Sequence, residues 1–511
     1  MTTSGSIIRL LRSRGGNVAV IFALTVSSAI VIGGGGMDIL RMTNNRKYLQ
    51  ERVDATALYV ANGLTSATLS TAQATAEKHL ASLVDAEHGT LSGIVATPSD
   101  GTLKLDATLS TESTFLSMVG VPALETTVST TVTWGETALE IALVLDNTGS
   151  MLDSNKLSSL KTAATSMVST MSAKVTTQNT LKFALVPFQT FVNVGTTYKN
   201  ASWIDNAGLS PYHSSYFSSS LNRFTLYSNL GKSWPGCVES RPSPYDIDDT
   251  APTASNPSTL FVPTFNPDEP DTTYKSGRYT YNLYPNSYLG DDTTNSDDLV
   301  RLKQASKYTK MSNKDFSNSV FYSNYSLPKG PGFGCDVQAV TRLTNSYSSV
   351  KTSINAMTAS GSTNIPEGLA WGWRMLSPQA PFSDGQSYDS TTLKIVVLLT
   401  DGTNSIPTWT SALGGAYSSW GYPYSNRTST NAGTYMRDGL DAKTRAVCTA
   451  IKAKGIKIYT IGLMIDDSAG QQLLSDCSSG TDFYYNSPTA GQLDTVFASI
   501  AQKITKLRIA K

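Results

Sequence analysis

Three oxygen-bearing side chains stand at alternating positions directly after an apolar run in this chain. The run Ile141–Leu145 leads into Asp146, Thr148 and Ser150. A continuous apolar run is typical of a buried parallel strand, and ligands of open α/β sheets lie just beyond the carboxyl ends of such strands. One carboxylate with two hydroxyls suits a hard cation, because Mg²⁺ combines few carboxylates with neutral oxygens and water. The loop therefore predicts part of a divalent-cation site.

Helix and strand patterns alternate downstream of Asp146. The predicted elements are, in chain order, helix 156–172, strand 181–192, strand 393–399, helix 441–454, strand 456–463 and helix 492–507. Alternation of this kind predicts an α/β domain with a parallel, doubly wound sheet. The strand 393–399 leads into Thr400 and Asp401, so we expect a second carboxylate at the same edge of the sheet as Asp146.

Three segments, in order along the chain, resemble the von Willebrand factor A (VWA) domain and its metal-ion-dependent adhesion site. The family's Asp-x-Ser-x-Ser motif is matched by Asp146-Asn-Thr148-Gly-Ser150, where a threonine replaces the middle serine but keeps a hydroxyl. A loop threonine before a helix is matched by Thr363, and an aspartate after a buried strand by Asp401. The resemblance covers about 139–195 and 346–507.

This resemblance implies that Asp146, Ser150 and Thr363 touch the metal directly. It also implies that Thr148 orients ligands or coordinates in some states, and that Asp401 acts directly or through water. With only two carboxylates, one coordination position would stay open to water or to an Asp or Glu of a protein partner. The expected cation is Mg²⁺, with Mn²⁺ or Ca²⁺ as alternatives. The other possibility is a degraded site, or one used only for stability.

An uncharged apolar run occupies residues 18–37. A helix of this length spans roughly 30 Å, the thickness of a bilayer's hydrocarbon core. Because arginines at 9, 12 and 14 precede the run and Asp38 follows it, we expect residues 1–17 in the cytoplasm and the rest outside. A cleaved signal peptide is the alternative to this uncleaved anchor. Four glycines at 33–36 predict a bend or a close helix contact.

Residues 38–137 read as a helical stalk followed by a small sheet. Apolar residues at three- and four-residue spacing predict an amphipathic helix that continues the anchor. The predicted elements are helix 39–61, helix 71–84, strands 92–97, 102–109 and 126–134, and a short helix within 112–119. This order is pilin-like.

The N-terminal segment resembles that of TadE/TadG-like proteins, which take part in assembling Flp-type (tight adherence) pili. The similar stretches are 14–23, the region of Asp38, and 46–58, so the resemblance covers about 10–62. Type IV pilins have a glutamate five residues after the glycine at which they are cut, but here Ile21 follows Gly16 at that distance. The resemblance to the TadG-like branch therefore implies a retained anchor.

A Tyr-, Asn- and Ser-rich insertion, 196–345, interrupts the predicted VWA domain of 138–507. We expect it to fold over the metal-bearing face, with its acidic clusters solvated rather than bound to Ca²⁺. The four cysteines show no CxxC spacing, and their order along the chain favours Cys237 with Cys335 and Cys448 with Cys477. Four cysteines permit three connectivities, and buried free thiols remain an alternative.

Charged residues make up only 15% of the 511 residues, and the net charge is +1, so nothing indicates a nucleic-acid partner. The histidines His79, His88 and His213 are scattered and expected to be exposed. Lys156, on the first predicted helix, is expected to be solvated. No histidine or lysine base lies near Ser150 in the sequence, and neither Gly-x-Ser-x-Gly nor a P-loop occurs, so we do not expect an enzyme.

These patterns and resemblances together predict a single-pass protein of the bacterial inner membrane whose C-terminal bulk is periplasmic or extracellular. The expected role is non-enzymatic pilus assembly or adhesion, with a protein partner, such as a pilus assembly component, bound through the cation. The alternative is a surface adhesin that grips host or matrix glycans or proteins through the insertion, with a purely structural metal site.

Overall fold

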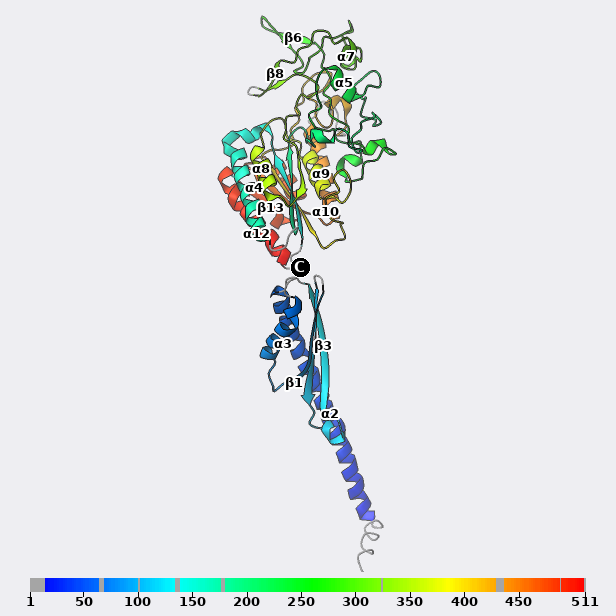
Figure 1. Cartoon of the computed structure of the whole chain (residues 1–511), viewed down its shortest axis with the longest axis vertical. Helices are drawn as coiled ribbons and strands as arrows, with labels where there is room; N and C mark the ends of the chain where they lie inside the picture. The colour runs from blue at the N-terminus through cyan, green and yellow to red at the C-terminus, as the bar shows by residue number, and fades with distance from the viewer. Residues whose placement is uncertain are drawn as a thin grey trace, which may run out of the picture. The chain divides into compact units, whose positions relative to one another are not determined.

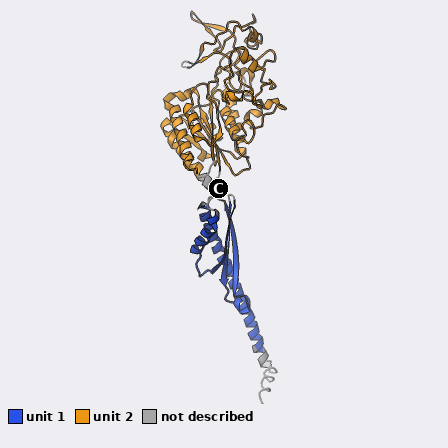
Figure 2. Ribbon diagram, in the orientation of Figure 1, with its two compact units in different colours: residues 1–136, 511 blue, residues 137–510 orange. Residues whose placement is uncertain are grey.

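The computed structural model describes residues 14–63, 69–99, 102–133, 138–175, 180–322, 325–428, 436–487 and 489–509. They fall into two compact units that divide near residue 136 (Figure 2). Arg9 and Arg12, on which the predicted topology depends, lie outside the described residues, as does Trp134 at the end of a predicted strand.

The first unit is built on one 50-residue helix, α2 (Arg14–Gly63). Its second half buries Leu49, Val53 and Ala57, which share one face because they are four residues apart. A second helix, α3 (Ala72–Leu83), covers part of the same small core. Among the described helices, α2 alone is long and apolar enough to cross a membrane, a property that it shares with signal sequences.

Three antiparallel strands complete this unit, in the order β1-β2-β3. Their bounds are β1 (Thr90–Ser99), β2 (Thr102–Glu112) and β3 (Ala123–Thr133). The central strand buries alternate residues from Leu103 to Leu109 against α2 and α3, as expected of a sheet with one face covered. The helix predicted within 112–119 is a short 3₁₀ turn, η2 (Leu116–Val119), because β2 continues to Glu112.

The second unit has a six-stranded sheet in the order β10-β5-β4-β11-β12-β13. The strands are β4 (Leu139–Asp146), β5 (Leu181–Phe188), β10 (Thr341–Thr344), β11 (Leu393–Thr400), β12 (Lys457–Leu463) and β13 (Tyr484–Ser487). All pairs are parallel except β10 with β5, so the predicted α/β class is confirmed, while the edge strand β10 departs from the predicted parallel sheet. The strand predicted over 181–192 ends earlier, at Phe188.

Helices cover both faces of this sheet (Figure 1). One face carries α4 (Lys156–Ser172), α8 (Tyr347–Ala356) and α12 (Leu493–Ile509), and the other α9 (Ile365–Leu376), α10 (Met436–Ala453) and α11 (Ser468–Cys477). Along β4, Ile141 and Leu143 belong to the core on the face covered by α4, α8 and α12. Ala142 and Val144 belong to the core on the face covered by α9, α10 and α11. The apolar run thus reads as continuous because both faces are buried.

The insertion consists mainly of loops that lie beyond the carboxyl ends of the strands (Figure 1). Its short elements are α5 (Arg223–Asn229), β6 (Thr273–Ser276), β7 (Tyr279–Asn282), α6 (Asp298–Leu302), α7 (Lys307–Lys310), β8 (Asn318–Tyr322) and β9 (Tyr325–Pro328). Aromatic residues such as Trp203, Phe261 and Phe265 share one core with the sheet and α9. The insertion is therefore an extension of the α/β unit rather than a separate body.

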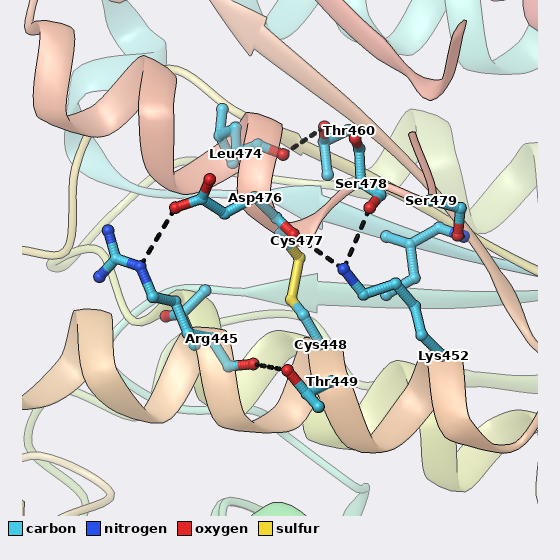
Figure 3. Close-up of a disulfide and its surroundings, with 12 residues drawn as sticks. Arg445, Cys448, Thr449, Lys452, Thr460, Leu474, Asp476, Cys477, Ser478 and Ser479 are labelled. Atoms are coloured by element: carbon cyan, nitrogen blue, oxygen red, sulfur yellow. Dashed lines mark hydrogen bonds and ion pairs between the residues drawn. A yellow bond between two sulfur atoms is a disulfide. The ribbon is translucent and has the colours of Figure 1, made fainter. Parts of the chain in front are cut away.

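Two disulfides join the cysteines in the pairs favoured by chain order. Cys237–Cys335 closes most of the insertion, and Cys448–Cys477 ties α10 to α11. Around the second bridge, the Lys452 ammonium donates to the carbonyls of Asp476 and Ser478 at 2.8 and 3.1 Å (Figure 3). The end of α11 is thus held to α10 both covalently and by hydrogen bonds.

The insertion's acidic clusters are not simply solvated, which corrects the expectation from sequence. Asp246, Asp249, Asp268 and Glu269 are all buried. The reason is distant partners that local sequence does not reveal: Asp268 lies 2.6 Å from the Lys307 ammonium, and Asp246 pairs with a lysine of α10.

His213 is likewise fully buried rather than exposed. Its Nδ1 lies 2.9 Å from the Asp205 carboxylate, and its Nε2 accepts from the backbone N–H of Arg223 at 3.0 Å. Both ring nitrogens therefore have partners inside the protein, which removes the penalty of burying them.

Candidate metal centre

Asp146 is the last residue of β4 and is completely buried. One carboxylate oxygen accepts from the backbone N–H of Thr148 at 2.7 Å, and the other from the Thr400 hydroxyl at 2.6 Å. Burial first, and then the nearby charge of Asp401, raises the pKa of Asp146 to about 7. A carboxylate in this position is stabilised in its ionised form by a cation.

Hydroxyl groups link the β4 loop to the end of β11. The Thr148 and Ser150 hydroxyl oxygens are 3.1 Å apart, and the Ser150 hydroxyl donates to Asp401 Oδ1 at 2.7 Å. Thr148 and Asp401 are buried, whereas Ser150 is exposed. The row of oxygens from Thr148 to Asp401 therefore reaches solvent at Ser150.

Thr363 lies on the loop that precedes α9, and backbone contacts bring this loop beside the other two. The N–H of Gly149 donates to the carbonyl of Gly361 at 3.1 Å. Thr363 exchanges backbone hydrogen bonds of 3.2 and 2.9 Å with Ser405, and its hydroxyl would lie 3.9 Å from a Cβ at Gly402. All five residues predicted for the metal site are thus brought to one end of the sheet.

Lys156 was predicted from the sequence to be solvated, and this prediction is wrong. Its side chain is only 11% exposed, and its ammonium lies 2.8 Å from Asp401 Oδ2. The cause is local backbone geometry: Ser154 and Asn155 have φ values of 53° and 58°, which turn the chain sharply before α4 begins. Lys156 therefore supplies a fixed positive charge next to one of the two carboxylates.

Two further residues support the site although the sequence motifs did not include them. Thr400 holds Asp146, as described above, and a hydroxyl directly before Asp401 at a strand end was a usable signal. Asn147 is buried, and its amide donates to the carbonyl of Thr358 at 2.9 Å. This bond ties the β4 loop to the segment that carries Thr363.

The insertion is fastened beside this site. The Gln189 side-chain amide donates to the carbonyl of Gly334 and to the Asp336 carboxylate, both at 2.9 Å. The amide oxygen of Gln189, Oε1, lies against Gly361. A Cβ added at Gly361 would fall 1.4 Å from this oxygen, and the φ of Gly361 is +67°. Only glycine fits there, so the position of the Thr363 loop depends on contacts with the strand end that also holds the insertion.

The donor set fits a hard cation. Two carboxylates and three hydroxyls from three segments offer only oxygen, the ligand that Mg²⁺ and Ca²⁺ prefer. Within the described residues there is no group of three or more His, Cys, Asp or Glu side chains that could hold a metal. A cation at this place would therefore depend on the hydroxyls of Thr148, Ser150 and Thr363 as well as on the carboxylates.

Searches against protein families and curated proteins find no match for this chain. Among solved structures, it is similar to the pilus adhesin SpaC from Lactobacillus rhamnosus GG, with 12% identity, a TM-score of 0.32, and coverage of 81% of this chain but only 34% of SpaC.

This chain is also similar to the vWF domain of the type V pili tip protein Mfa5 from Porphyromonas gingivalis, with 11% identity and a TM-score of 0.35. The similarity covers 73% of this chain and 97% of the Mfa5 domain. A third similar structure is the PilB minor pilin from Streptococcus sanguinis, with 11% identity and a TM-score of 0.33. The similarity covers 83% of this chain and 80% of PilB. All three TM-scores lie below 0.5, so these likenesses carry no weight for function.

Proposed function

We propose that this chain is a membrane-anchored, non-enzymatic protein of pilus assembly or adhesion whose α/β unit binds a protein partner through a divalent cation. The observation that carries the proposal is the convergence of Asp146, Thr148, Ser150, Thr363 and Asp401 from three distant segments. The strand order of the sheet and the sequence resemblances support a doubly wound VWA-type domain in a TadG-like protein.

In this proposal each residue has a separate task. Asp146, held by Thr148 and Thr400, is a fixed anionic ligand, and Thr363 adds a hydroxyl from the loop before α9. Ser150 stands where the site meets solvent, so a partner's carboxylate could approach there. When bound, a divalent cation would bridge the protein's carboxylates to an Asp or Glu of the partner. No proton transfer or nucleophile is needed.

The proposed location is the bacterial inner membrane, with residues 1–17 in the cytoplasm and the α/β unit in the periplasm or outside the cell. The apolar half of α2 supports the anchor. The two disulfides support an oxidising compartment for the α/β unit, because structural disulfides persist mainly outside the cytoplasm.

The test is a titration of the full-length protein with Mg²⁺, Mn²⁺ and Ca²⁺ while thermal unfolding is followed. A bound cation should raise the melting temperature with concentration. Asp146→Ala and Thr363→Ala should remove most of the effect. Asp153→Ala is the matched control, because this exposed acid lies on the same loop outside the site. An unchanged melting temperature with all three cations would refute metal binding by the chain alone.

A cross-linked pulldown with and without chelator then tests the partner. Recovery of a protein partner with the cation, and its loss with chelator or with Asp146→Ala, would support cation-bridged binding. Equal recovery under all conditions would refute it.

A second candidate function, adhesion through the insertion, is favoured by one surface feature. The β6–β7 hairpin carries Tyr274, Tyr279 and Tyr281, which are 50%, 64% and 46% exposed. The rings of Tyr274 and Tyr281 stack at 5.6 Å, and Tyr279 lies 6.3 Å from Tyr281. Exposed tyrosines of this kind give rigid contact area in binding loops.

This candidate is separable from the first by mutation. Tyr274→Ala with Tyr281→Ala should abolish retention on host or matrix glycans and leave the cation response unchanged. Retention that survives this double change would refute adhesion through the hairpin.

A further inference from the structure

The loop between β2 and β3 packs onto the apolar part of α2. A Cβ at Gly34 would fall 2.2 Å from the Phe115 ring, and one at Gly35 would fall 2.8 Å from a methyl of Leu116. The two glycines therefore form a recess in which Phe115 and Leu116 rest. The sequence led us to expect a bend or a close helix contact at glycines 33–36, whereas the close contact of Gly34 and Gly35 is with this loop. Both glycines belong to the uncharged run 18–37, so this loop lies beside the segment proposed to be in the membrane.

The carboxylate of Asp38 fixes the loop to the helix. One oxygen accepts from the backbone N–H of Thr114 at 3.1 Å, and the other from those of Phe115 and Leu116 at 2.8 and 2.9 Å. These N–H groups begin the η2 turn and would otherwise lack partners. Asp38 thus joins the end of the apolar run to the start of the loop.

Most of the loop's other backbone groups are paired within the loop itself. The N–H of Gly120 donates to the carbonyl of Ser117 at 3.1 Å, and that of Val121 to the carbonyl of Leu116 at 3.1 Å. Ser113 pairs with both Pro122 and Val121. Internal pairing is what a segment needs where water is scarce, because an unpaired backbone group is costly in an apolar layer.

The side chains that the loop turns outward are apolar. Met118 is 71% exposed, Val119 57% and Val121 39%, and no charged residue occurs from 113 to 124. On α2, Met37 and Leu40 are each 65% exposed. The exposed side chains of the loop thus form an apolar surface at the level of the last turn of the run, because Phe115 and Leu116 rest on Gly34 and Gly35. A soluble domain seldom leaves such a surface to water.

We infer that residues 114–121 insert into the interfacial layer of the membrane that α2 crosses, so that Met118 and Val119 contact lipid. The inference rests on the proposed anchoring of α2. Lipid is the fitting occupant because the loop surface continues the apolar run and starts about four residues, or roughly 6 Å of helix, before its charged end. The loop and the helix would enter the bilayer as one wedge, which fixes the depth of the anchor and of the small sheet above it.

The test places a polarity-sensitive fluorophore at position 118 in the full-length protein. The four native cysteines are paired in disulfides, so a maleimide probe reacts only with an introduced cysteine. Met118→Cys is labelled and reconstituted in phosphatidylcholine vesicles that contain nitroxide lipids, with the spin label either near the headgroup or near the chain end. Phe22→Cys serves as the reference in the apolar run, and Val95→Cys, 54% exposed on β1, as the reference in water.

We expect blue-shifted emission at 118 with strongest quenching by the headgroup-proximal nitroxide, deeper quenching at 22, and none at 95. If position 22 is quenched while 118 behaves like 95, lipid insertion of the loop is refuted and the anchor stands. A blue shift at 118 without lipid quenching would mean that protein covers the loop, which also refutes it. If neither 22 nor 118 is quenched, the anchoring proposal itself fails.

Discussion

Replacing Asp146 with asparagine should stabilise the cation-free protein above pH 7 and abolish its response to a divalent cation. Asparagine keeps the shape of the side chain and can retain both contacts. Its carbonyl oxygen can accept from the Thr148 N–H, and its amide can donate to the Thr400 hydroxyl. The main change is therefore the loss of one buried negative charge.

The size of the effect follows from the pKa of Asp146, which burial and the charge of Asp401 raise from 3.8 to about 7. One pKa unit corresponds to 1.36 kcal/mol, so the ionised carboxylate costs the cation-free fold about 4 kcal/mol above pH 7. Because the folded state holds this proton more tightly than the unfolded state, stability falls as the pH rises from about 4 to about 7. Asparagine forms weaker hydrogen bonds than a carboxylate, so we expect a net gain of about 2–4 kcal/mol at pH 8.

The assay is denaturant unfolding of both proteins in chelator and in Mg²⁺, across this pH range. Tryptophan fluorescence reports on the α/β unit, since every tryptophan except Trp134 lies at or beyond residue 203. The difference in unfolding free energy between the two proteins cancels the titration of other groups. It should grow with pH in chelator, and in Mg²⁺ it should shrink or reverse, because only the wild type gains from the cation.

Two results would refute this reasoning. A variant that is less stable than the wild type at pH 8 in chelator would mean that the carboxylate is already well compensated without a cation. A difference that does not change between pH 4 and pH 8 would mean that Asp146 does not titrate in this window.

Three other changes should have distinct effects. Lys156→Met should strengthen Mg²⁺ binding about tenfold or more, because it removes an ammonium 2.8 Å from Asp401. Lys161→Met on the same helix is the control, and equal affinities in a calorimetric titration would contradict competition between ammonium and cation. Replacing Cys448 and Cys477 with serine opens a 29-residue loop and should lower the free energy of unfolding by about 3–4 kcal/mol. A loss under about 1 kcal/mol in a denaturant melt would contradict a stabilising role of this disulfide. Burial raises the pKa of Glu269 to about 7, so its ionised form destabilises the fold as pH rises from about 4.5 to 7. Glu269→Gln should therefore stabilise the protein at pH 8 and not at pH 4, as measured by denaturant melts, and equal effects at both values would exclude the charge as the cause.

The features that could be predicted from the sequence are those that leave a pattern within one short segment. The apolar run before Asp146 is a fully buried strand, and the hydroxyl spacing after it, together with Thr363 and Asp401, located the three segments that meet. Element ends were less accurate, as β5 shows. A run of apolar residues states that a segment is buried and how its side chains alternate, but not where its backbone pairing stops.

The features that the sequence did not predict depend on contacts between residues far apart in the chain. Asp268, in one of the insertion's acidic clusters, was expected in water, yet Lys307, 39 positions later, lies 2.6 Å from it. Lys156 was expected in water because the helical pattern of α4 places it at the helix start. Its burial comes from a backbone turn at Ser154 and Asn155 and from Asp401, 245 positions away. No periodicity within a segment encodes such partners.

Lys156 also bears on why the proposed site would recognise an acidic partner only when a cation is present. With Asp146 and Asp401 ionised, two carboxylates and one ammonium leave one net negative charge, which repels a further carboxylate. Addition of a divalent cation makes the net charge positive by one, and a single Asp or Glu of a partner then neutralises it. Without Lys156, the cation alone would neutralise the two carboxylates, and the partner's charge would have nothing to balance. In the proposed site the lysine would thus weaken cation binding and at the same time give the loaded site its attraction for one acidic side chain, so Lys156→Met should bind Mg²⁺ more tightly but recover less partner in the pulldown.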